Sequence, residues 1–304
     1  MRIYHRGDKI PREDTAVALG TFDGMHLGHR SIIERMVREA DGMRTAAYTF
    51  RNIPAAYFGG RAEALFTEAE KISAFEALGV DVLVLEEFDR KIAEISPERF
   101  VDRLTDGLGA RKIYAGFNYT FGAAARGTSM VLERLARERG AEVSIADPVT
   151  YKGEPVSSTR IRAALAAGDA EKAEAMLGAP YVMHGVVQGG KRLGRSIGFP
   201  TVNFYPPKHK LCPMHGVYAS YVLFEGERYI GITNIGSRPT VDDGDAVNLE
   251  THIIGFHRDI YGKPIEIQLK RRLRGEVKFA GVTELQNQLS RDKRAAIQLL
   301  GGRK

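Results

Sequence analysis

The first half of the chain alternates short apolar runs, typical of buried strands, with stretches whose apolar positions recur every three or four residues, typical of helices. The predicted strands span residues 15–20, 45–50, 80–85, 112–115 and 142–145. The predicted helices span residues 31–40, 68–78, 97–108 and 130–139. Strands that alternate with helices predict a parallel sheet with helices on both faces. Ligands of such sheets bind at the carboxyl ends of the strands.

A change of pattern follows residue 150. Two short helices are predicted over residues 159–167 and 169–177, and Gly178 and Pro180 then end the helical periodicity. Five strands follow with turn residues between them, over residues 181–188, 216–224, 228–235, 248–256 and 264–270. Closely spaced strands without helices between them predict an antiparallel barrel or sandwich, closed by a helix over residues 283–300.

The length of 304 residues suits two domains, which we place at residues 1–180 and 181–304. The charged start of the chain does not resemble a secretory signal, and no apolar run approaches the roughly 18 residues of a membrane-spanning helix. Cys212 is the only cysteine, which fits a reducing compartment. We therefore expect a soluble cytoplasmic protein without a membrane partner. The sequence leaves the oligomeric state open.

The formal net charge of +6 favours acidic partners, among which nucleotides and nucleic acids both count. Basic residues are spread along the chain apart from a short cluster at residues 270–274. The chain has no basic tail and no repeat of basic and aromatic residues, so we do not expect a nucleic-acid partner.

A glycine-framed loop with two histidines lies between the first predicted strand and the first predicted helix. Gly20 and Gly24 allow a tight turn close to a ligand, and the helix start favours an anion. His26 and His29 lie three positions apart, so both rings can face one phosphate. The alternative is a pair of surface histidines on an ordinary loop. The glycine frame and the position of the loop favour a phosphate site.

This loop resembles the His-x-Gly-His signature of the nucleotidylyltransferase superfamily, and with Phe22, Asp23 and Gly24 it is similar to the FAD synthetase module of bacterial bifunctional riboflavin kinase/FAD synthetases. A second similar motif runs from Ser157 to Arg162, at a helix start. A simple helix cap would explain that motif if it stood alone. For this module the resemblance implies His26 and His29 in catalysis. It also implies a set of ATP-binding residues: Gly20, Phe22, Asp23, Gly24, Gly28, Asn118, Ser158, Thr159 and Arg162.

The module also departs from the family pattern. Relatives usually carry an acidic residue and a histidine before a proline after the second strand, where this chain has Arg51, Asn52 and Ile53 before Pro54. Asn118 stands where aspartate is frequent. Lost carboxylates would weaken binding of Mg²⁺ or flavin, so an inactive adenylyltransferase module is an alternative.

A second glycine-rich segment, residues 185–203, combines a close loop with basic side chains. Read alone, Gly189, Gly190 and Lys191 could form a hairpin turn. The string through Asn203 resembles riboflavin kinase, whose Pro-Thr-x-Asn motif holds Mg²⁺ through its threonine and asparagine. Further similar motifs follow in order, at residues 216–219, 233–240, 249–253, 259–262 and 273–279. The resemblance covers essentially the whole second half.

For this module the resemblance implies Glu250 as the general base, which would take the proton of the ribityl hydroxyl. We expect Glu250 to point inward, near Thr201 and Asn203, the two implied metal ligands; an isolated glutamate would instead be an ordinary solvated strand residue. The implied ATP-binding residues are Gly189, Gly190, Lys191, Gly194, Arg195, Thr201 and Asn203. Arg274 and Phe279 are candidates for contacts to the nucleotide or the flavin, because a flat isoalloxazine ring favours aromatic walls.

Together these resemblances imply an α/β parallel-sheet, Rossmann-like nucleotidylyltransferase domain and then an antiparallel β-barrel domain with a C-terminal helix. The implied enzyme phosphorylates riboflavin to FMN and adenylylates FMN to FAD, with ATP as co-substrate and Mg²⁺ as cofactor. One alternative is a riboflavin kinase whose first module is weakened or inactive. A second is a flavin- or nucleotide-binding regulator without turnover, which the presence of Thr201, Asn203 and Glu250 disfavours.

Overall fold

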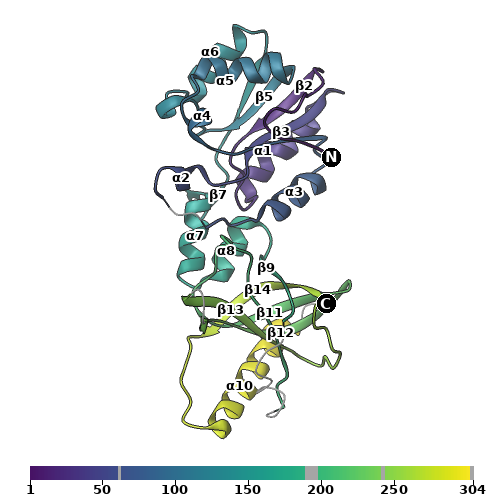
Figure 1. The fold of residues 1–304 in the computed structure, drawn as a ribbon, viewed down its shortest axis with the longest axis vertical. Coiled ribbons are helices and arrows are strands. Elements are labelled where there is room, and N and C mark those ends of the chain that lie inside the picture. The colour runs from purple at the N-terminus through teal and green to yellow at the C-terminus, as the bar shows by residue number, and fades with distance from the viewer. Residues whose placement is uncertain (61–62, 189–197, 241–243, 302–304) are drawn as a thin grey trace. The chain divides into compact units, whose positions relative to one another are not determined.

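The computed structural model describes residues 1–60, 63–188, 198–240 and 244–301 (Figure 1). Contacts within the chain divide it into two compact units, Met1–Ser158 and Thr159–Lys304. We expected the boundary at residue 180, after helices α7 (Ser158–Ala166) and α8 (Ala170–Leu177). The division instead lies at the start of α7. The physical reason is that α8 packs on strands of the second unit.

The first unit is built on a six-stranded sheet in which every pairing is parallel, with the order β1-β4-β3-β2-β5-β6. Its strands are β1 (Arg2–Tyr4), β2 (Thr15–Leu19), β3 (Arg44–Phe50), β4 (Val82–Glu86), β5 (Ala110–Gly116) and β6 (Glu142–Ala146). The chain runs outward from β2 to β3 and β4 and then returns to the other side of β2 with β5. The strand order therefore reverses between β2 and β5, where ligands of such sheets bind.

Helices cover both faces of this sheet. They are α1 (Leu27–Arg38), α2 (Pro54–Tyr57), α3 (Glu68–Ala77), α4 (Arg90–Ala93), α5 (Pro97–Asp102), the π-helical turn η1 (Arg103–Gly107), the 3₁₀ turn η2 (Ala123–Ala125) and α6 (Ser129–Arg137). A short hairpin of β7 (Thr150–Tyr151) and β8 (Glu154–Pro155) follows the sheet. The parallel α/β fold predicted from the alternating pattern is confirmed.

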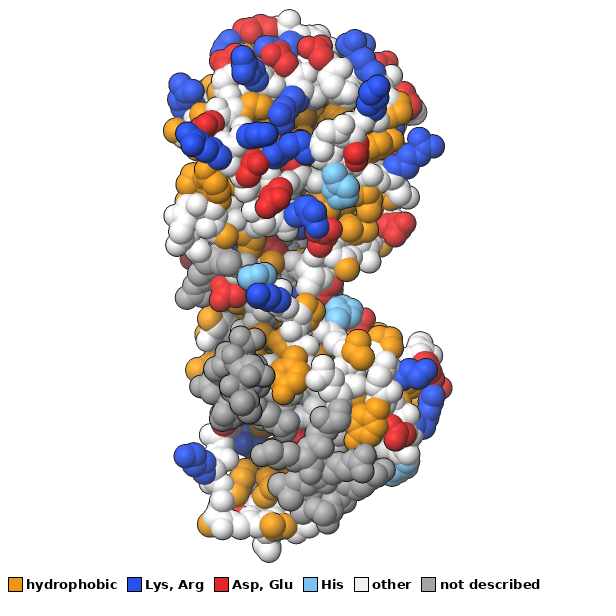
Figure 2. All heavy atoms as spheres, viewed as in Figure 1, with side chains coloured by type: hydrophobic (Ala, Val, Ile, Leu, Met, Phe, Trp, Pro, Cys, Tyr) orange, Lys and Arg blue, Asp and Glu red, His pale blue; other side chains and the backbone are white. Residues whose placement is uncertain are grey.

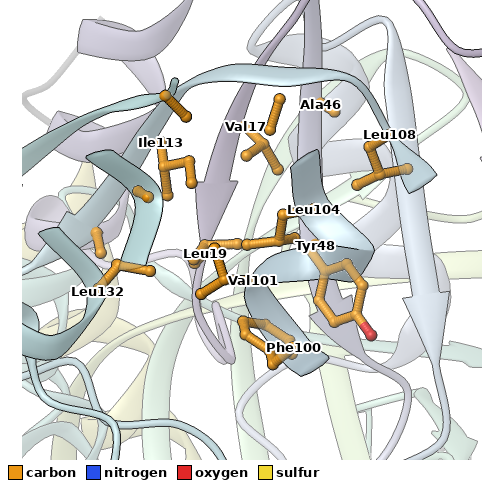
Figure 3. Packing of buried hydrophobic residues seen from close by; sticks show 14 of the residues in the cluster. Val17, Leu19, Ala46, Tyr48, Phe100, Val101, Leu104, Leu108, Ile113 and Leu132 are labelled. Atoms are coloured by element: carbon orange, nitrogen blue, oxygen red, sulfur yellow. The ribbon is translucent and has the colours of Figure 1, made fainter. Parts of the chain in front are cut away.

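Alternate residues of the central strand β2 enter two separate cores, because successive side chains of a strand point to opposite faces. Val17 and Leu19 pack in one cluster with residues of α5, η1 and α6, as Figure 3 shows. Ala16 and Ala18 pack in the other, against α1 and α3. All four side chains are almost completely buried. The continuous apolar run of β2 therefore reflects burial on both faces.

The second unit is an antiparallel sheet with the order β10-β13-β12-β11-β14-β9. Its strands are β9 (Tyr181–Val186), β10 (Thr201–Phe204), β11 (Gly216–Phe224), β12 (Glu227–Thr240), β13 (Gly244–Ile253) and β14 (Pro264–Arg274), and helix α10 (Val282–Leu300) ends the unit. The backbone N–H of Gln188 donates to the carbonyl of Asn203 at 2.7 Å. Since Gln188 follows β9 and Asn203 lies on β10, this bond joins the two edge strands and closes a barrel. The predicted antiparallel barrel with a C-terminal helix is confirmed.

Helix α10 packs on one face of the barrel sheet. Ala296 and Leu300 of this helix share a core cluster with Val217, Ala219 and Ile232 of the sheet. The opposite face carries a row of buried hydroxyls: Ser220 lies 2.8 Å from Thr233, which lies 3.0 Å from Thr251. Successive residues of β13 point to opposite faces of the sheet, so Thr251 and every second residue from it lie on the hydroxyl face. The residues between them lie on the face that α10 covers.

The surface of the first unit carries both signs of charge. On the face in view in Figure 2, Lys and Arg side chains lie interspersed with Asp and Glu. In the described part of the chain, no helix combines the length and the apolar character needed to cross a bilayer.

Candidate active sites

The two histidines of the glycine-framed loop stack on each other at the start of α1. His26 is the N-cap of this helix, and its Nδ1 accepts the backbone N–H of His29 at 3.2 Å. The two rings lie 3.6 Å apart between centroids, with an angle of 17° between their planes. The helix thus begins four residues earlier than predicted, and His29 belongs to its first turn. The predicted pairing of the rings on one turn is what the structure contains.

The backbone of this loop is tightly curled. Phe22, Gly24 and Met25 all have positive φ angles, of 47°, 82° and 41°. Such angles are unstrained for Gly24 alone, because glycine has no Cβ. Gly28 has a different role: a Cβ at this position would lie 3.3 Å from the imidazole of His26, so its absence leaves room for the ring.

Both imidazoles are neutral at physiological pH. Burial lowers the pKa of His26 from 6.5 to about 4. Burial is the largest cause that lowers the pKa of His29 well below 6.5, and electrostatic interaction with His26 and Lys71 lowers it further. Because the Nδ1 of His26 accepts a hydrogen bond, its proton resides on Nε2, which is then a donor. The Nδ1 of His29 is buried and has no hydrogen-bond partner in the described part of the chain.

A buried lysine that we did not predict lies beneath the loop. Lys71, on α3, is 5% exposed, and its ammonium donates to the carbonyls of Thr21 at 3.1 Å and Phe50 at 2.6 Å. Burial lowers its pKa from 10.5 to about 8, and Asp23 and Glu68 oppose this shift. The available signal was its spacing, because Lys71 is four residues before the buried Phe75 and so falls on the apolar face of the helix.

The two phosphate motifs of the first module are in contact through Asp23. Its carboxylate accepts the backbone N–H groups of Leu65 and Phe66 at 3.1 and 3.0 Å, and its carbonyl accepts the hydroxyl of Ser158 at 2.9 Å. Through these contacts Asp23 connects the histidine loop to two other segments of the unit. Two other predicted residues, Thr159 and Arg162, follow on α7 and belong to the second unit.

The carboxyl edge of the sheet also carries Asn118 and the residues that depart from the family pattern. Asn118 is exposed in the turn after β5, the neighbour of β2. Arg51 forms an ion pair of 2.7 Å with Glu68 of α3. Asn52 donates to the carbonyl of Phe88 and accepts the backbone N–H of the same residue, at 3.0 and 2.8 Å. These substitutions are therefore integrated into the local structure.

Four aromatic residues gather at the same edge of the sheet. Phe88 lies edge-on to Phe50, Tyr57 and Phe58, with centroids 5.2, 5.7 and 5.8 Å apart. Phe58 is 70% exposed, a large fraction for a phenylalanine. We did not select these residues from the sequence, because Phe88 lies more than 25 positions after the other three. Together they form an apolar surface suited to a flat ring.

In the second unit, three alternate side chains of β13 hold the Pro-Thr-x-Asn segment. Glu250 accepts the hydroxyl of Thr201 at 2.7 Å. The side-chain Nδ2 of Asn248 donates to the Oδ1 of Asn203 at 3.2 Å. The Nδ1 of His252 lies 2.9 Å from the carbonyl of Pro200. The strand register places Asn203 directly opposite Glu250.

The expected proximity of Glu250 to Thr201 and Asn203 is therefore what the structure contains, but two details differ. Thr201 and Asn203 lie on strand β10 rather than in a loop. Glu250 alternates with Leu249 and Thr251, both completely buried on the hydroxyl face, so it points to the face on which α10 packs. Pairing with β13 explains both details, since it extends the chain and sets the direction of each side chain.

Two buried polar atoms that flank Glu250 have no hydrogen-bond partner among the residues that the structure describes. They are the Oδ1 of Asn248 and the Nε2 of His252, in residues that are 4% and 7% exposed. Burial lowers the pKa of His252, so its ring is neutral. We selected neither residue from the sequence. Their positions two residues before and after the predicted base were the available signal.

Arg274 and Phe279 lie where β14 leads toward α10. The guanidinium of Arg274 makes contacts of 2.8 to 3.2 Å with the carboxylate of Asp292 on this helix, and it lies 5.7 Å from the ring centroid of Phe279. The structure therefore brings these two predicted residues together. The predicted residues Gly189, Gly190, Lys191, Gly194 and Arg195 lie outside the described part of the chain.

Comparisons with known proteins match both units. A model of the FAD synthetase family matches residues 8–160, and a model of the riboflavin kinase family matches residues 177–300. The bifunctional riboflavin kinase/FMN adenylyltransferase of Bacillus subtilis is 35% identical over 97% of this chain and 95% of its own. This chain belongs to the bifunctional riboflavin kinase/FMN adenylyltransferase family. The resemblance stated from the two motifs is thereby confirmed.

Other members of the bifunctional riboflavin kinase/FMN adenylyltransferase family are similarly related. The Escherichia coli K12 protein is 34% identical over 99% of this chain and 97% of its own. Among solved structures, one named as a macrolide-efflux protein from Streptococcus pneumoniae covers 97% of this chain and 99% of its own, at 29% identity and a TM-score of 0.89. The likeness to that structure extends over both units.

Proposed function

We propose that this protein phosphorylates riboflavin to FMN in its second unit and joins the AMP of ATP to FMN in its first, which gives FAD and pyrophosphate. The observation that carries this proposal is the coexistence of two separate polar sites, each in a unit that matches one family. The stacked histidines begin α1 in the first. The bond between Thr201 and Glu250 joins β10 to β13 in the second.

In the kinase unit, Glu250 is the proposed general base. The hydrogen bond from Thr201 occupies its Oε1 and orients the carboxylate toward β10. In the proposed step the Glu250 carboxylate accepts the proton of the ribityl 5′-hydroxyl while the hydroxyl oxygen attacks the γ-phosphorus of ATP, and ADP leaves. A positioned carboxylate supplies about 10²–10⁴-fold in such a proton transfer.

Thr201 and Asn203 are the proposed residues for Mg²⁺. The donor set fits this ion, since hydroxyl, amide and carboxylate oxygens are hard ligands. The Oδ1 of Asn248, which has no hydrogen-bond partner within the described ranges, adds another oxygen beside Asn203. When bound, the ion would neutralise charge on the phosphates of ATP. The protein's own part is orientation: Asn248 holds the amide of Asn203, and His252 holds the carbonyl of Pro200.

Adenylyl transfer in the first unit needs no protein nucleophile. A phosphate oxygen of FMN attacks the α-phosphorus of ATP, a P–O bond forms, and the bond to the departing pyrophosphate breaks. The protein supplies alignment and hydrogen-bond donors for the charge on the phosphates. We assign this role to the Nε2–H of His26 and to the ring of His29, with the curled loop and the start of α1 supporting the phosphates.

The proposed flavin surface of the first unit is the aromatic cluster of Phe50, Tyr57, Phe58 and Phe88. The cluster follows the carboxyl ends of β3 and β4, the same edge at which the histidine loop follows β2. In the second unit, Phe279 and Arg274 are the proposed contacts for nucleotide or flavin. Riboflavin, FMN and ATP are then the partners, and we propose that the protein works in the cytoplasm.

Product analysis tests this proposal. The full chain incubated with riboflavin, ATP and Mg²⁺ should form FMN first and FAD afterwards, with ADP and pyrophosphate as by-products. FMN supplied directly should give FAD without ADP. Formation of FMN but never FAD would favour a kinase with an inactive first module, for which Arg51 and Asn118 provide the argument. Tight binding of FMN or ATP without any turnover would indicate a regulator instead.

A further inference from the structure

The ammonium of Lys71 is buried inside the first unit, and among the described residues it forms no hydrogen bond to a carboxylate. Its ammonium donates to two backbone carbonyls, those of Thr21 and Phe50. Burying an ammonium in this way is costly, because neutral carbonyls replace only part of its hydration. A methionine would fill the same space at a lower cost, so the presence of the charge requires an explanation beyond packing.

The two carbonyls belong to the two segments that build the site. Thr21 lies in the histidine loop, and Phe50 ends β3 within the aromatic cluster. From Thr21 a chain of contacts continues to the histidines: the ring of Phe22 lies 5.2 Å from that of His29, which contacts His26. Phe22 also packs against Phe75, on the same helix as Lys71. The position of the ammonium is therefore coupled to the position of the imidazoles.

We propose that Lys71 is a positioning residue for adenylyl transfer, whose ammonium holds the histidine loop against the end of β3 and so fixes His29 for phosphate binding. This inference rests on the adenylyl transfer proposed above. The charged groups that face Lys71 are Asp23 of the loop, Glu68 of its own helix and His29 of α1. With a pKa of about 8, the ammonium is charged at pH 7 and loses its proton in mildly alkaline solution.

Lys71→Met is the test, and Thr49→Val is its matched control. The hydroxyl of Thr49 donates to the same Thr21 carbonyl at 3.0 Å, so the control removes a hydrogen bond from that carbonyl but no charge. Lys71→Met should lower kcat/KM for FAD formation from FMN at least tenfold, whereas Thr49→Val should change it less than threefold. FMN formation by the second unit should stay within twofold in both variants, which shows that the effect is confined to the first unit.

The pH profile separates positioning by charge from simple structural support. FAD formation by the unchanged protein and by Thr49→Val should decline as the pH rises through about 8, and the residual activity of Lys71→Met should lack this decline. The inference is overturned if Lys71→Met forms FAD within twofold of the unchanged protein. It is also overturned if the variant keeps the alkaline decline, or if FMN formation falls in parallel.

A failure of the proposed function itself would look different. The unchanged protein would then form FMN but no FAD. In that case the nuclear magnetic resonance titration of His29 still tests Lys71, because removal of the nearby positive charge should raise the pKa of His29. An unchanged titration of His29 in Lys71→Met would overturn the inference on this ground alone.

Discussion

The hydroxyl of Thr201 donates to Glu250 at 2.7 Å, and this hydrogen bond connects neighbouring strands, β10 and β13, at the proposed kinase site. The two residues are almost 50 positions apart in the chain, and strand pairing alone brings them into contact. Asn203 lies opposite Glu250 in the same pairing. A proposed base and both proposed metal residues thus occupy a single pair of strands, whose spacing is set by backbone hydrogen bonds.

We expect Glu250→Ala to reduce FMN formation by at least a hundredfold, because no carboxylate would remain to take the ribityl proton. FAD formation from supplied FMN should be unchanged, since the first unit has its own site. Chromatography of the products from riboflavin and from FMN measures both steps. Glu225→Gln, a carboxylate change at an exposed turn of the same unit, is the control. Loss of both steps in Glu250→Ala would contradict the assignment of Glu250 to one unit.

The complementary change is His29→Ala, for which FAD formation should fall by about 10²–10³-fold, the usual effect of losing one donor to developing charge. FMN formation should continue at its normal rate. The same product assay applies, with exposed His257→Ala as the control. If His29→Ala stopped FMN formation and spared FAD formation, the division of labour between the units would be reversed.

The buried histidines predict a pH dependence of stability. The imidazole of His26 binds a proton near pH 6.5 in the unfolded chain but only near pH 4 in the folded one. The unfolded state therefore holds more protons between these values, and the free energy of unfolding should fall by about 1.4 kcal/mol per pH unit from this group as the pH drops through the window. Above pH 6.5 both states are neutral, and the effect disappears.

Urea unfolding at pH 7 and pH 5 measures this effect. His26→Asn should show a smaller difference between the two values than the unchanged protein, and the shift of His29 has the same sign. An equal difference in the variant would mean that His26 is not the group responsible.

The ion pair between Arg274 and Asp292 joins β14 to α10 and predicts a loss of stability when it is broken. Asp292 is 4% exposed, and its removal leaves the guanidinium in a partly buried position without its partner. Asp292→Ala should lower the free energy of unfolding by about 3–5 kcal/mol, as expected for an uncompensated charge. Replacing both residues, as Arg274→Met with Asp292→Leu, should cost much less.

Equilibrium unfolding followed by circular dichroism distinguishes these variants. Equal losses for Asp292→Ala and for the double variant would indicate that packing of α10, rather than the charge pair, sets the stability. FAD formation in the first unit provides an independent check that only the second unit is affected.

The residues themselves were sufficient to predict much of the fold. The apolar runs of β2, β3 and β4 and the helical spacing of α3 and α6 are local patterns, because each side chain's burial repeats with the period of its own element. The histidine loop could also be identified from the sequence, because its glycines, its histidines and the helix start follow one another along the chain. Short elements such as β1, α2 and β10 were not predicted, because three or four residues are too few to display a period.

What only the tertiary structure decided was which distant groups meet. Lys71 contacts carbonyls 50 and 21 positions away. Asn248 contacts Asn203 of β10, and His252 contacts Pro200 just before this strand. Phe88 contacts Phe50 and Phe58, which lie far from it in the sequence. The sequence of each segment specifies its own helix or strand and the side that it buries. The register of strand pairing and the docking of helices then determine the contacts, because they satisfy packing and hydrogen bonding for the whole chain at once.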